Sequence, residues 1–242
     1  MADATYDFKK AYKDFYMPAP VPALIDVPPM TFIAVAGQGD PNEEGGAYAR
    51  ALNALYALSF TIKMSKKGAW QPAGYFDYVV PPLEGLWWTP CKEAAFTGAE
   101  LTNKQELHWV SLIRQPDFVT PEVFAWALQT AQAKKPELAE VLAQARLVRF
   151  AEGPCVQMLH KGPYDTESQS IAQMQTFVAE HGISEALGLP QGEDPALMLA
   201  ELDVQGAVLR VRLHHEIYLG DPRRSKPANL KTVIRHPVER LG

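Results

Sequence analysis

The feature that most constrains this sequence is a short pattern that occurs twice, about half a chain apart. Ile113-Arg-Gln-Pro116 in the first half matches Ile234-Arg-His-Pro237 in the second. A strand-like segment with one acidic residue among large apolar ones precedes each copy, at Leu83–Trp88 and at His215–Leu219. Similarity at matching places of a repeated pattern indicates duplication of a structural unit. We therefore predict that the chain consists of two related halves.

Each half has the pattern of a strand, a long helix and two further strands. In the first half, Met30–Ala36 is rich in β-branched and aromatic residues, and Ala47–Ser65 has apolar residues at helical spacing. Two strand candidates follow, at Tyr75–Trp88 and Leu107–Gln115. The same order recurs in the second half, in these segments: a strand or strand pair at Leu147–His160, a helix at Thr166–His181, a hairpin at Leu197–Leu219 and a strand at Leu230–Val238.

Together the halves predict an α+β fold, a tandem βαββ repeat with pseudo-two-fold symmetry. One curved antiparallel sheet would carry two long helices on one face, with a central cleft where the halves meet. We expect a single domain spanning residues 1–242. Its expected parts are an N-terminal strap at 1–29, a first βαββ unit at 30–119, connecting helices at 120–146 and a second βαββ unit at 147–242.

Charge and composition exclude several classes of partner. The net charge of -5 offers no general attraction to nucleic acid or to anionic lipid, so we predict a small-molecule partner, no nucleic acid and no membrane. The N-terminus has no signal-peptide pattern, which indicates a cytoplasmic protein, and a monomer is the expected state. Cys91 and Cys155 are far apart and have no metal-type spacing, so both are expected to be reduced core thiols.

Two glutamates are the strongest candidates for chemistry. Glu84 and Glu216 each stand inside an apolar strand, where a carboxylate is costly to bury without a partner or a cationic ligand. Their places in the repeat predict that they are equivalent. Strand alternation places His214, Glu216 and Tyr218 on one face. It groups Tyr78 with Glu84 and Trp88 unless Pro81-Pro82 and Gly85 introduce a bulge. The alternative is that both glutamates face water at strand ends.

Aromatic residues gather near these acids in the sequence, and they are the remaining candidates for ligand binding. Aromatic walls with a buried carboxylate suit flat cationic molecules, which they bind by stacking and by cation–π attraction. The alternative interpretation is an ordinary aromatic core. The predicted ligand-binding set comprises Tyr78, Glu84, Trp88, Trp109, Tyr164, Glu216 and Tyr218.

No metal site and no cofactor are predicted. His214 and His215 are adjacent, so they point to opposite faces of a strand and do not share a metal ion. Gly37-Gln-Gly-Asp-Pro41 lacks the later glycine or lysine of a phosphate-binding loop.

These residues resemble the stand-alone GyrI-like small-molecule-binding proteins. The resemblance rests on segments that span most of the chain: Tyr6-Asp-Phe-Lys-Lys10, Gly37-Gln-Gly-Asp-Pro-Asn42, Pro82-Leu-Glu-Gly-Leu-Trp-Trp88, Ile113-Arg-Gln-Pro-Asp-Phe-Val119 and His214-His-Glu-Ile-Tyr-Leu-Gly-Asp-Pro-Arg223. It implies a tandem βαββ pseudo-dimer whose central cleft has aromatic walls and a glutamate, at the position of Glu216. Relatives include effector domains of multidrug-responsive activators. The segment 190–213 is longer than the family pattern implies.

Three functions follow as hypotheses. The first is a stand-alone module that senses or sequesters a small aromatic or cationic molecule. The second comes from the resemblance, because some stand-alone relatives hydrolyse cyclopropane-containing alkylating toxins with a pocket carboxylate and a tyrosine, which implies Glu216 and Tyr218 as catalytic residues. The third, haem binding through a related fold, has no distinctive ligand pattern in this sequence.

Overall fold

The structure is a computed structural model that describes residues 5–68, 70–89, 104–188, 208–220 and 225–240, together with 196 and 199. Cys155 is a buried free thiol, as predicted. Cys91 and much of the 190–213 segment lie outside the described residues.

The described residues form a mixed α+β fold. The helices are α1 (Phe8–Ala11), α2 (Lys13–Tyr16), α3 (Ala47–Lys63), α4 (Pro121–Lys134), α5 (Ala139–Gln144) and α6 (Glu167–Glu180). The main sheet contains β2 (Ala23–Val27), β3 (Met30–Gln38), β5 (Leu83–Trp88), β6 (His108–Arg114), β7 (Arg146–Phe150), β8 (Gly153–Lys161), β9 (Ile183–Glu185), β10 (Val208–Leu209), β11 (His214–Tyr218) and β12 (Lys231–Arg240). β1 (Tyr6–Asp7) and β4 (Tyr78–Val79) pair separately.

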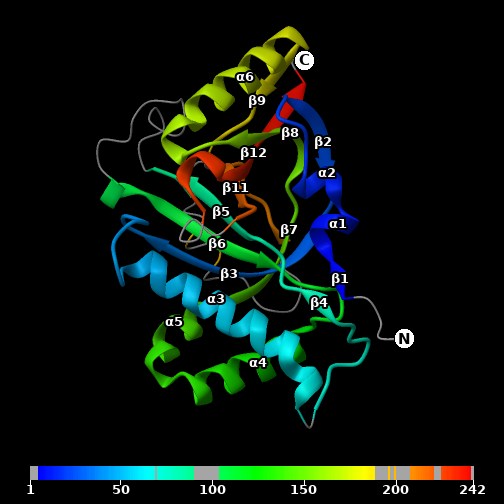
Figure 1. Cartoon of the computed structure of the whole chain (residues 1–242), viewed down its shortest axis with the longest axis vertical. Coiled ribbons are helices and arrows are strands. Elements are labelled where there is room, and N and C mark those ends of the chain that lie inside the picture. The colour runs from blue at the N-terminus through cyan, green and yellow to red at the C-terminus, as the bar shows by residue number, and fades with distance from the viewer. Residues whose placement is uncertain are drawn as a thin grey trace.

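The strand order confirms the tandem βαββ repeat. The central strands follow the order β3-β6-β5-β11-β12-β8, in which the second half mirrors the first, and all five pairings are antiparallel. α3 follows β3 and packs on it, as α6 follows β8 and packs on it. In Figure 1, α6 lies at one end of the molecule and α3, α4 and α5 at the other, with the strands between them.

The packing of the repeated pattern agrees with this symmetry. Ile113 is buried in one cluster with Ile33 of β3 and the apolar face of α3. Ile234 is buried in another with Met158 of β8 and the apolar face of α6. The strand register places both isoleucines on one face of the sheet, the face that the two long helices cover.

The first strand of each half-chain crosses to the other half. β2 precedes β3 but pairs with β8, and β7 precedes β8 but pairs with β3. Only two residues separate β2 from β3, and two separate β7 from β8, although β3 and β8 are five positions apart in the sheet order. The sheet must therefore curl into a half-barrel, and Val27 of β2 meets Val148 of β7 in one apolar cluster on its inner face.

Two details of the sequence prediction are wrong. Tyr75–Trp88 is not one strand, because Pro81-Pro82 cannot donate ladder hydrogen bonds, so β4 and β5 belong to different sheets. The hairpin expected within Leu197–Leu219 is absent from its described part, because β10 pairs in parallel with β7 and not with β11.

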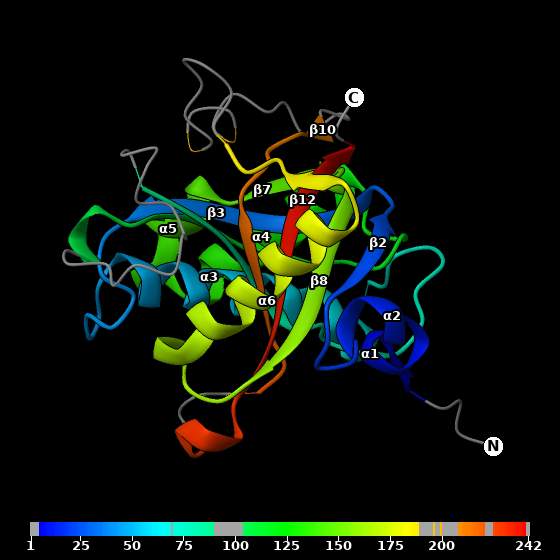
Figure 2. The same ribbon diagram turned by 90° about the horizontal axis from the view of Figure 1, so that it is seen from above.

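The part of the predicted strap that contains β1, α1 and α2, called the N-terminal arm here, packs beside the second half. Figure 2 shows α1 and α2 next to β2 and β8. The main-chain carbonyl of Asp14 accepts a hydrogen bond from the Gln157 side chain of β8 at 2.6 Å. Among the described helices, none combines the length and the apolar character that a bilayer-spanning segment needs. The domain limits given above stay a prediction.

Candidate active site

The candidate site lies where β5 and β11 join the two halves, on the face that carries α3 and α6. Glu216 of β11 pairs with Gly85 of β5, and the side chains of His214 and Tyr218 share its face because strand residues alternate. A Cβ atom on Gly85 would lie 2.6 Å from the Trp87 indole nitrogen and 3.1 Å from the Tyr218 hydroxyl. The absence of a side chain at Gly85 therefore allows Trp87 and Tyr218 to approach the backbone of β5 beside Glu216.

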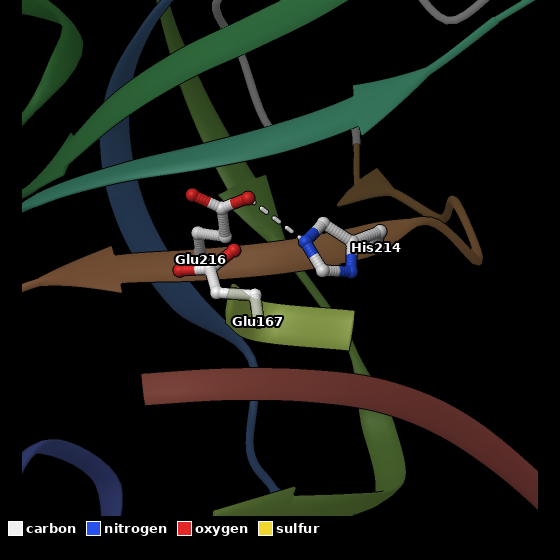
Figure 3. A group of neighbouring side chains, drawn as sticks. All are labelled: Glu167, His214 and Glu216. Atoms are coloured by element: carbon white, nitrogen blue, oxygen red, sulfur yellow. Dashed lines mark hydrogen bonds and ion pairs between the residues drawn. The ribbon is translucent and has the colours of Figure 1, made fainter. Parts of the chain in front are cut away.

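A cluster of three residues, Glu167, His214 and Glu216, forms the centre of this site and is called the acid group here (Figure 3). Glu216 Oε1 lies 2.9 Å from Nε2 of His214. Glu167, in the first turn of α6, points toward both from the next layer, and one ligating atom of each residue lies within 4.8 Å of the others. Glu167 and Glu216 are 7% and 9% exposed, so two carboxyl groups share a largely buried site.

The electrostatics of this group are unbalanced. Burial, followed by the nearby charge of Glu216, raises the pKa of Glu167 well above its ordinary value. Burial lowers the pKa of His214 despite its contact with Glu216, so this imidazole is neutral near pH 7. The acid group therefore contains no full positive charge that could balance two carboxylates, and Glu167 keeps its proton.

Aromatic rings surround the acid group. The Tyr218 hydroxyl accepts a hydrogen bond from the indole nitrogen of Trp87 at 2.9 Å. The Tyr218 ring meets the Tyr164 ring edge to face, with centroids 5.9 Å apart. The ring of Tyr48, on α3, packs against the rings of Trp87 and Trp109, with centroids 5.4 and 5.2 Å apart. Residues of both halves thus build a single aromatic wall, and Tyr164, 38% exposed, forms its outer edge.

Unsatisfied polar atoms concentrate at the same place. Eight buried side-chain polar atoms of the described residues have no hydrogen-bond partner, and four of them lie on this face of the junction. They are the Trp109 indole nitrogen, the Ser111 and Thr232 hydroxyls and Oε1 of Glu167. Buried polar groups are normally paired, and neighbours for three of these atoms lie within the site, because Glu167 interacts with Thr232 and Glu216, and Ser111 interacts with Tyr48.

Glu84 lies on the opposite face of the sheet. It pairs with Ile217, and Glu216 pairs with Gly85, so the two glutamates are offset by one residue and point in opposite directions. The predicted equivalence of Glu84 and Glu216 is therefore wrong. Glu84 Oε1 instead accepts a hydrogen bond from the Tyr16 hydroxyl at 3.3 Å, and its Oε2 lies 3.0 Å from Nε2 of His215.

An ion network continues from Glu84 beneath the sheet. Glu152 lies 2.9 Å from Nδ1 of His215 and 3.0 Å from Nη1 of Arg235, and all four side chains are about 1% exposed. Burial acts to lower the pKa of His215, but the glutamates outweigh it and raise the pKa to about 9. Burial acts to raise the pKa of Glu152, but His215 and Arg235 lower it to about 2. Two negative and two positive charges thus balance.

The structure brings together part of the predicted ligand-binding set. Trp109, Tyr164, Glu216 and Tyr218 lie in the site described above. Tyr78 lies elsewhere, fully buried among Phe8 and other rings under the N-terminal arm, because it belongs to β4 and not to β5. Trp88 packs in the apolar cluster on the inner face of the sheet, because neighbouring strand residues point to opposite faces and Trp87 points into the site.

Sequence reasoning missed three residues of the site: Tyr48, Trp87 and Glu167. Tyr48 and Glu167 stand in the first turns of the two long helices, and an acid there is usually attributed to the helix dipole. A comparison of the first turns of both repeated helices would have drawn attention to them. Trp87 required the correct face of β5, which only the register shows.

Glu167, His214 and Glu216 are the described residues whose ligating atoms come close enough for a metal ion. Their spacing has another cause, because the ring nitrogens of His214 both make hydrogen bonds, to Glu216 and to His236. We interpret the group as a hydrogen-bonded acid site. A shallow depression of about 290 Å³ lies elsewhere, between α3 and α4, lined in part by Tyr56, Phe60 and Lys134. The central cleft stays a prediction.

Comparisons with known proteins show close relatives among solved structures. No protein-family model and no curated protein matches the chain. An uncharacterized conserved protein from Listeria innocua is 42% identical, with a TM-score of 0.81, and the alignment covers 97% of this chain and 100% of that one. Two solved structures of Listeria innocua hydrolases are each 40% identical with TM-scores of 0.79, and they align over their whole length with 97% and 98% of this chain. The chain belongs to the same family as these Listeria innocua proteins.

Proposed function

We propose that the protein is a hydrolase in which Glu216, Glu167 and Tyr218 add water to a small aromatic substrate that carries a strained electrophilic carbon. The observation that carries the proposal is the meeting of two largely buried carboxyl groups with a tyrosine inside an aromatic wall. The hydrolase relatives and the GyrI-like resemblance support the reaction type. The resemblance also supplies the substrate class, cyclopropane-containing alkylating compounds.

The two carboxyl groups have environments that suit opposite roles. Glu216, held by His214, accepts a proton from water, and the water oxygen forms a bond to the electrophilic ring carbon. The strained carbon–carbon bond breaks, and its electron pair moves into the conjugated acceptor of the substrate. Glu167, whose raised pKa keeps it protonated, gives a proton to the acceptor. The sum is the addition of one water molecule to the substrate.

Tyr218 orients the reacting groups. Its pKa is raised well above the ordinary value by burial and by Glu216, so its hydroxyl stays protonated. Because its oxygen already accepts the hydrogen bond from Trp87, its proton is directed toward a second partner, either Glu216 or the substrate. The exposed ring of Tyr164 offers a stacking surface at the edge of the site.

The proposal is tested by incubating the protein with a cyclopropane-containing DNA-alkylating compound and measuring the mass of the recovered compound. We expect a product heavier by one water molecule. Glu216→Gln should lower kcat by at least about a hundredfold. It should leave binding of the compound, measured by calorimetry, within a few fold. Glu239→Gln, an exposed glutamate on β12, is the matched control and should retain full turnover.

A binding module is the second candidate, because the aromatic wall with Glu216 suits a flat cationic molecule even without turnover. Compound recovered unchanged, with measurable binding that Glu216→Gln weakens, would support that candidate against the hydrolase. Failure of the compound to bind at all would contradict both for this substrate class. Turnover lost on treatment with a chelator and restored by a divalent cation would contradict the metal-free acid site.

A further inference from the structure

Glu216 stands at one end of a continuous hydrogen-bonded chain that leaves the candidate site. Its Oε1 lies 2.9 Å from Nε2 of His214, and Nδ1 of His214 lies 2.7 Å from Nε2 of His236. Nδ1 of His236 in turn lies 2.7 Å from Oε1 of Glu185. Each imidazole therefore uses both of its ring nitrogens, and two carboxyl groups form the ends.

Three strands hold this chain in place. β11 carries Glu216 and His214, and β12 carries His236 one residue beyond the paired Arg235. β9 carries Glu185, which pairs with Val238 of β12, so Glu185 and His236 share a face two residues apart. The chain thus runs across the sheet from the junction of the halves toward the edge formed by β9.

The burial of the four side chains changes along this path. His214 and His236 are 1% and 0% exposed, so water does not reach the middle. The side chains of Glu216 and Glu185 are 12% and 14% exposed. Both carboxyl ends are therefore slightly exposed to a similar degree, while the imidazoles between them are sealed.

Neutral imidazoles can carry a proton along such a chain without becoming charged. Each has one N–H donor and one acceptor nitrogen, so the three contacts of the chain are all satisfied when one of the two end carboxyl groups is protonated, and the tautomer of both rings is set by which end holds that proton. When Glu216 gives a proton to Nε2 of His214, Nδ1 of His214 gives its proton to Nε2 of His236. Nδ1 of His236 then gives its proton to the Glu185 carboxylate. Glu216 ends as a carboxylate, both imidazoles end in the other tautomer, and Glu185 ends protonated. The same transfers in reverse bring the proton back to Glu216, which gives it to the Glu167 carboxylate left by the reaction, so both imidazoles and all three carboxyl groups regain their starting forms.

We propose that His214 and His236 form a proton relay that returns Glu216 to its carboxylate form by passing its proton to Glu185. This inference rests on the proposed function, in which Glu216 takes a proton from water in each turnover. The relay lets the site hold that proton at Glu185 while the substrate or product still covers the aromatic wall. His214, His236 and Glu185 are then positioning and relay residues, and they do not touch the substrate.

Nuclear magnetic resonance of the isotope-labelled histidine rings tests the relay without any substrate, because the ring nitrogen shifts report the tautomer. We expect Glu185→Gln to change the tautomer populations of His214, which Glu185 does not contact. We likewise expect Glu216→Gln to change those of His236. Glu239→Gln, exposed on the same strand as His236, should change neither. If each variant alters only the histidine that it contacts, the two imidazoles are uncoupled and the relay is wrong.

Kinetics with the cyclopropane-containing compound give the second readout. Glu185→Gln lies at the partly exposed end and avoids a cavity in the core. It should lower kcat about tenfold or more while KM stays within about twofold, because proton return and not binding is affected. If the wild type turns the compound over and Glu185→Gln has the same kcat, the relay is wrong and the proposed hydrolase stands. Coupled tautomers in a wild type that shows no turnover would overturn the proposed hydrolase but keep the proton path.

Discussion

Among the described residues, two buried polar groups contain paired carboxylates, β11 contributes to each of them, and the two differ in charge balance. Below the sheet, Glu84 and Glu152 face His215 and Arg235, and the four charges cancel. Above it, Glu167 and Glu216 face a neutral His214, and Oε1 of Glu167 has no hydrogen-bond partner. A balanced network stabilises one folded arrangement, whereas an unbalanced one is typical of a site that handles protons. We call these the ion network and the acid group.

The largest effect is expected for Arg235→Met in the ion network. Removing one partner of a buried ion pair leaves Glu152 undercompensated, which typically costs about 3 to 5 kcal/mol in the free energy of unfolding. Urea denaturation measures the loss. Arg240→Met, at the exposed end of the same strand, should change stability by less than about 0.5 kcal/mol. Equal losses in both variants would remove the distinction between the network and an ordinary surface charge.

The ion network should also dominate the response to acid. The pKa of Glu152 is depressed to about 2, so its contribution is fully present above its ordinary value of 4.5 and is lost as the pH falls toward 2. The expected loss is about 3 kcal/mol between pH 5 and pH 2. Unfolding measured across this range in wild type and in Glu152→Gln checks it. The variant should start lower at pH 5 and show a shallower decline, and identical slopes would contradict this role.

The acid group should change the free energy of unfolding with pH in the opposite sense, because the buried Glu167 is destabilising once it loses its proton beside Glu216. Because the pKa of Glu167 is raised, the stability linked to it is present below its ordinary pKa of 4.5 and is lost as the pH rises through the folded value. Glu167→Gln should therefore match wild type near pH 4 and be more stable than wild type at pH 9. Glu180→Gln, exposed at the other end of α6, serves as control. A variant less stable than wild type at pH 9 would show that Glu167 is a stabilising carboxylate.

The smallest effect is expected where the N-terminal arm meets the ion network. Tyr16→Phe removes the hydroxyl that donates to Glu84, while His215 still contacts that carboxylate. The expected cost is about 0.5 to 1.5 kcal/mol. Tyr6→Phe, on the exposed part of the arm, should cost less, and thermal unfolding ranks the two. A cost above that of Arg235→Met would mean that the arm, and not the charge balance, holds the network together.

The sequence predicts the repeat because local patterns encode it, and the same is true of the shared face of His214, Glu216 and Tyr218. Strand alternation is a property of neighbouring residues, so one strand suffices to read it. Glu84 could not be assigned in this way, because its face depends on a one-residue register between β5 and β11. Glu167 and His236 escaped for a similar reason. Their contacts join elements far apart in the chain, and the repeated pattern that contains His236 does not reveal which residues its side chain contacts.

The exchange of β2 and β7 between the halves has a consequence for how a substrate enters. Each half is clamped by a strand whose connection to the other half is only two residues long. The halves therefore cannot swing apart, since separating them would break the pairing of β2 with β8 and of β7 with β3. Entry must depend on side chains and short turns at the rim, such as the turn that carries Tyr164. Substrate entry should therefore require local movements at the rim and no rearrangement of the sheet.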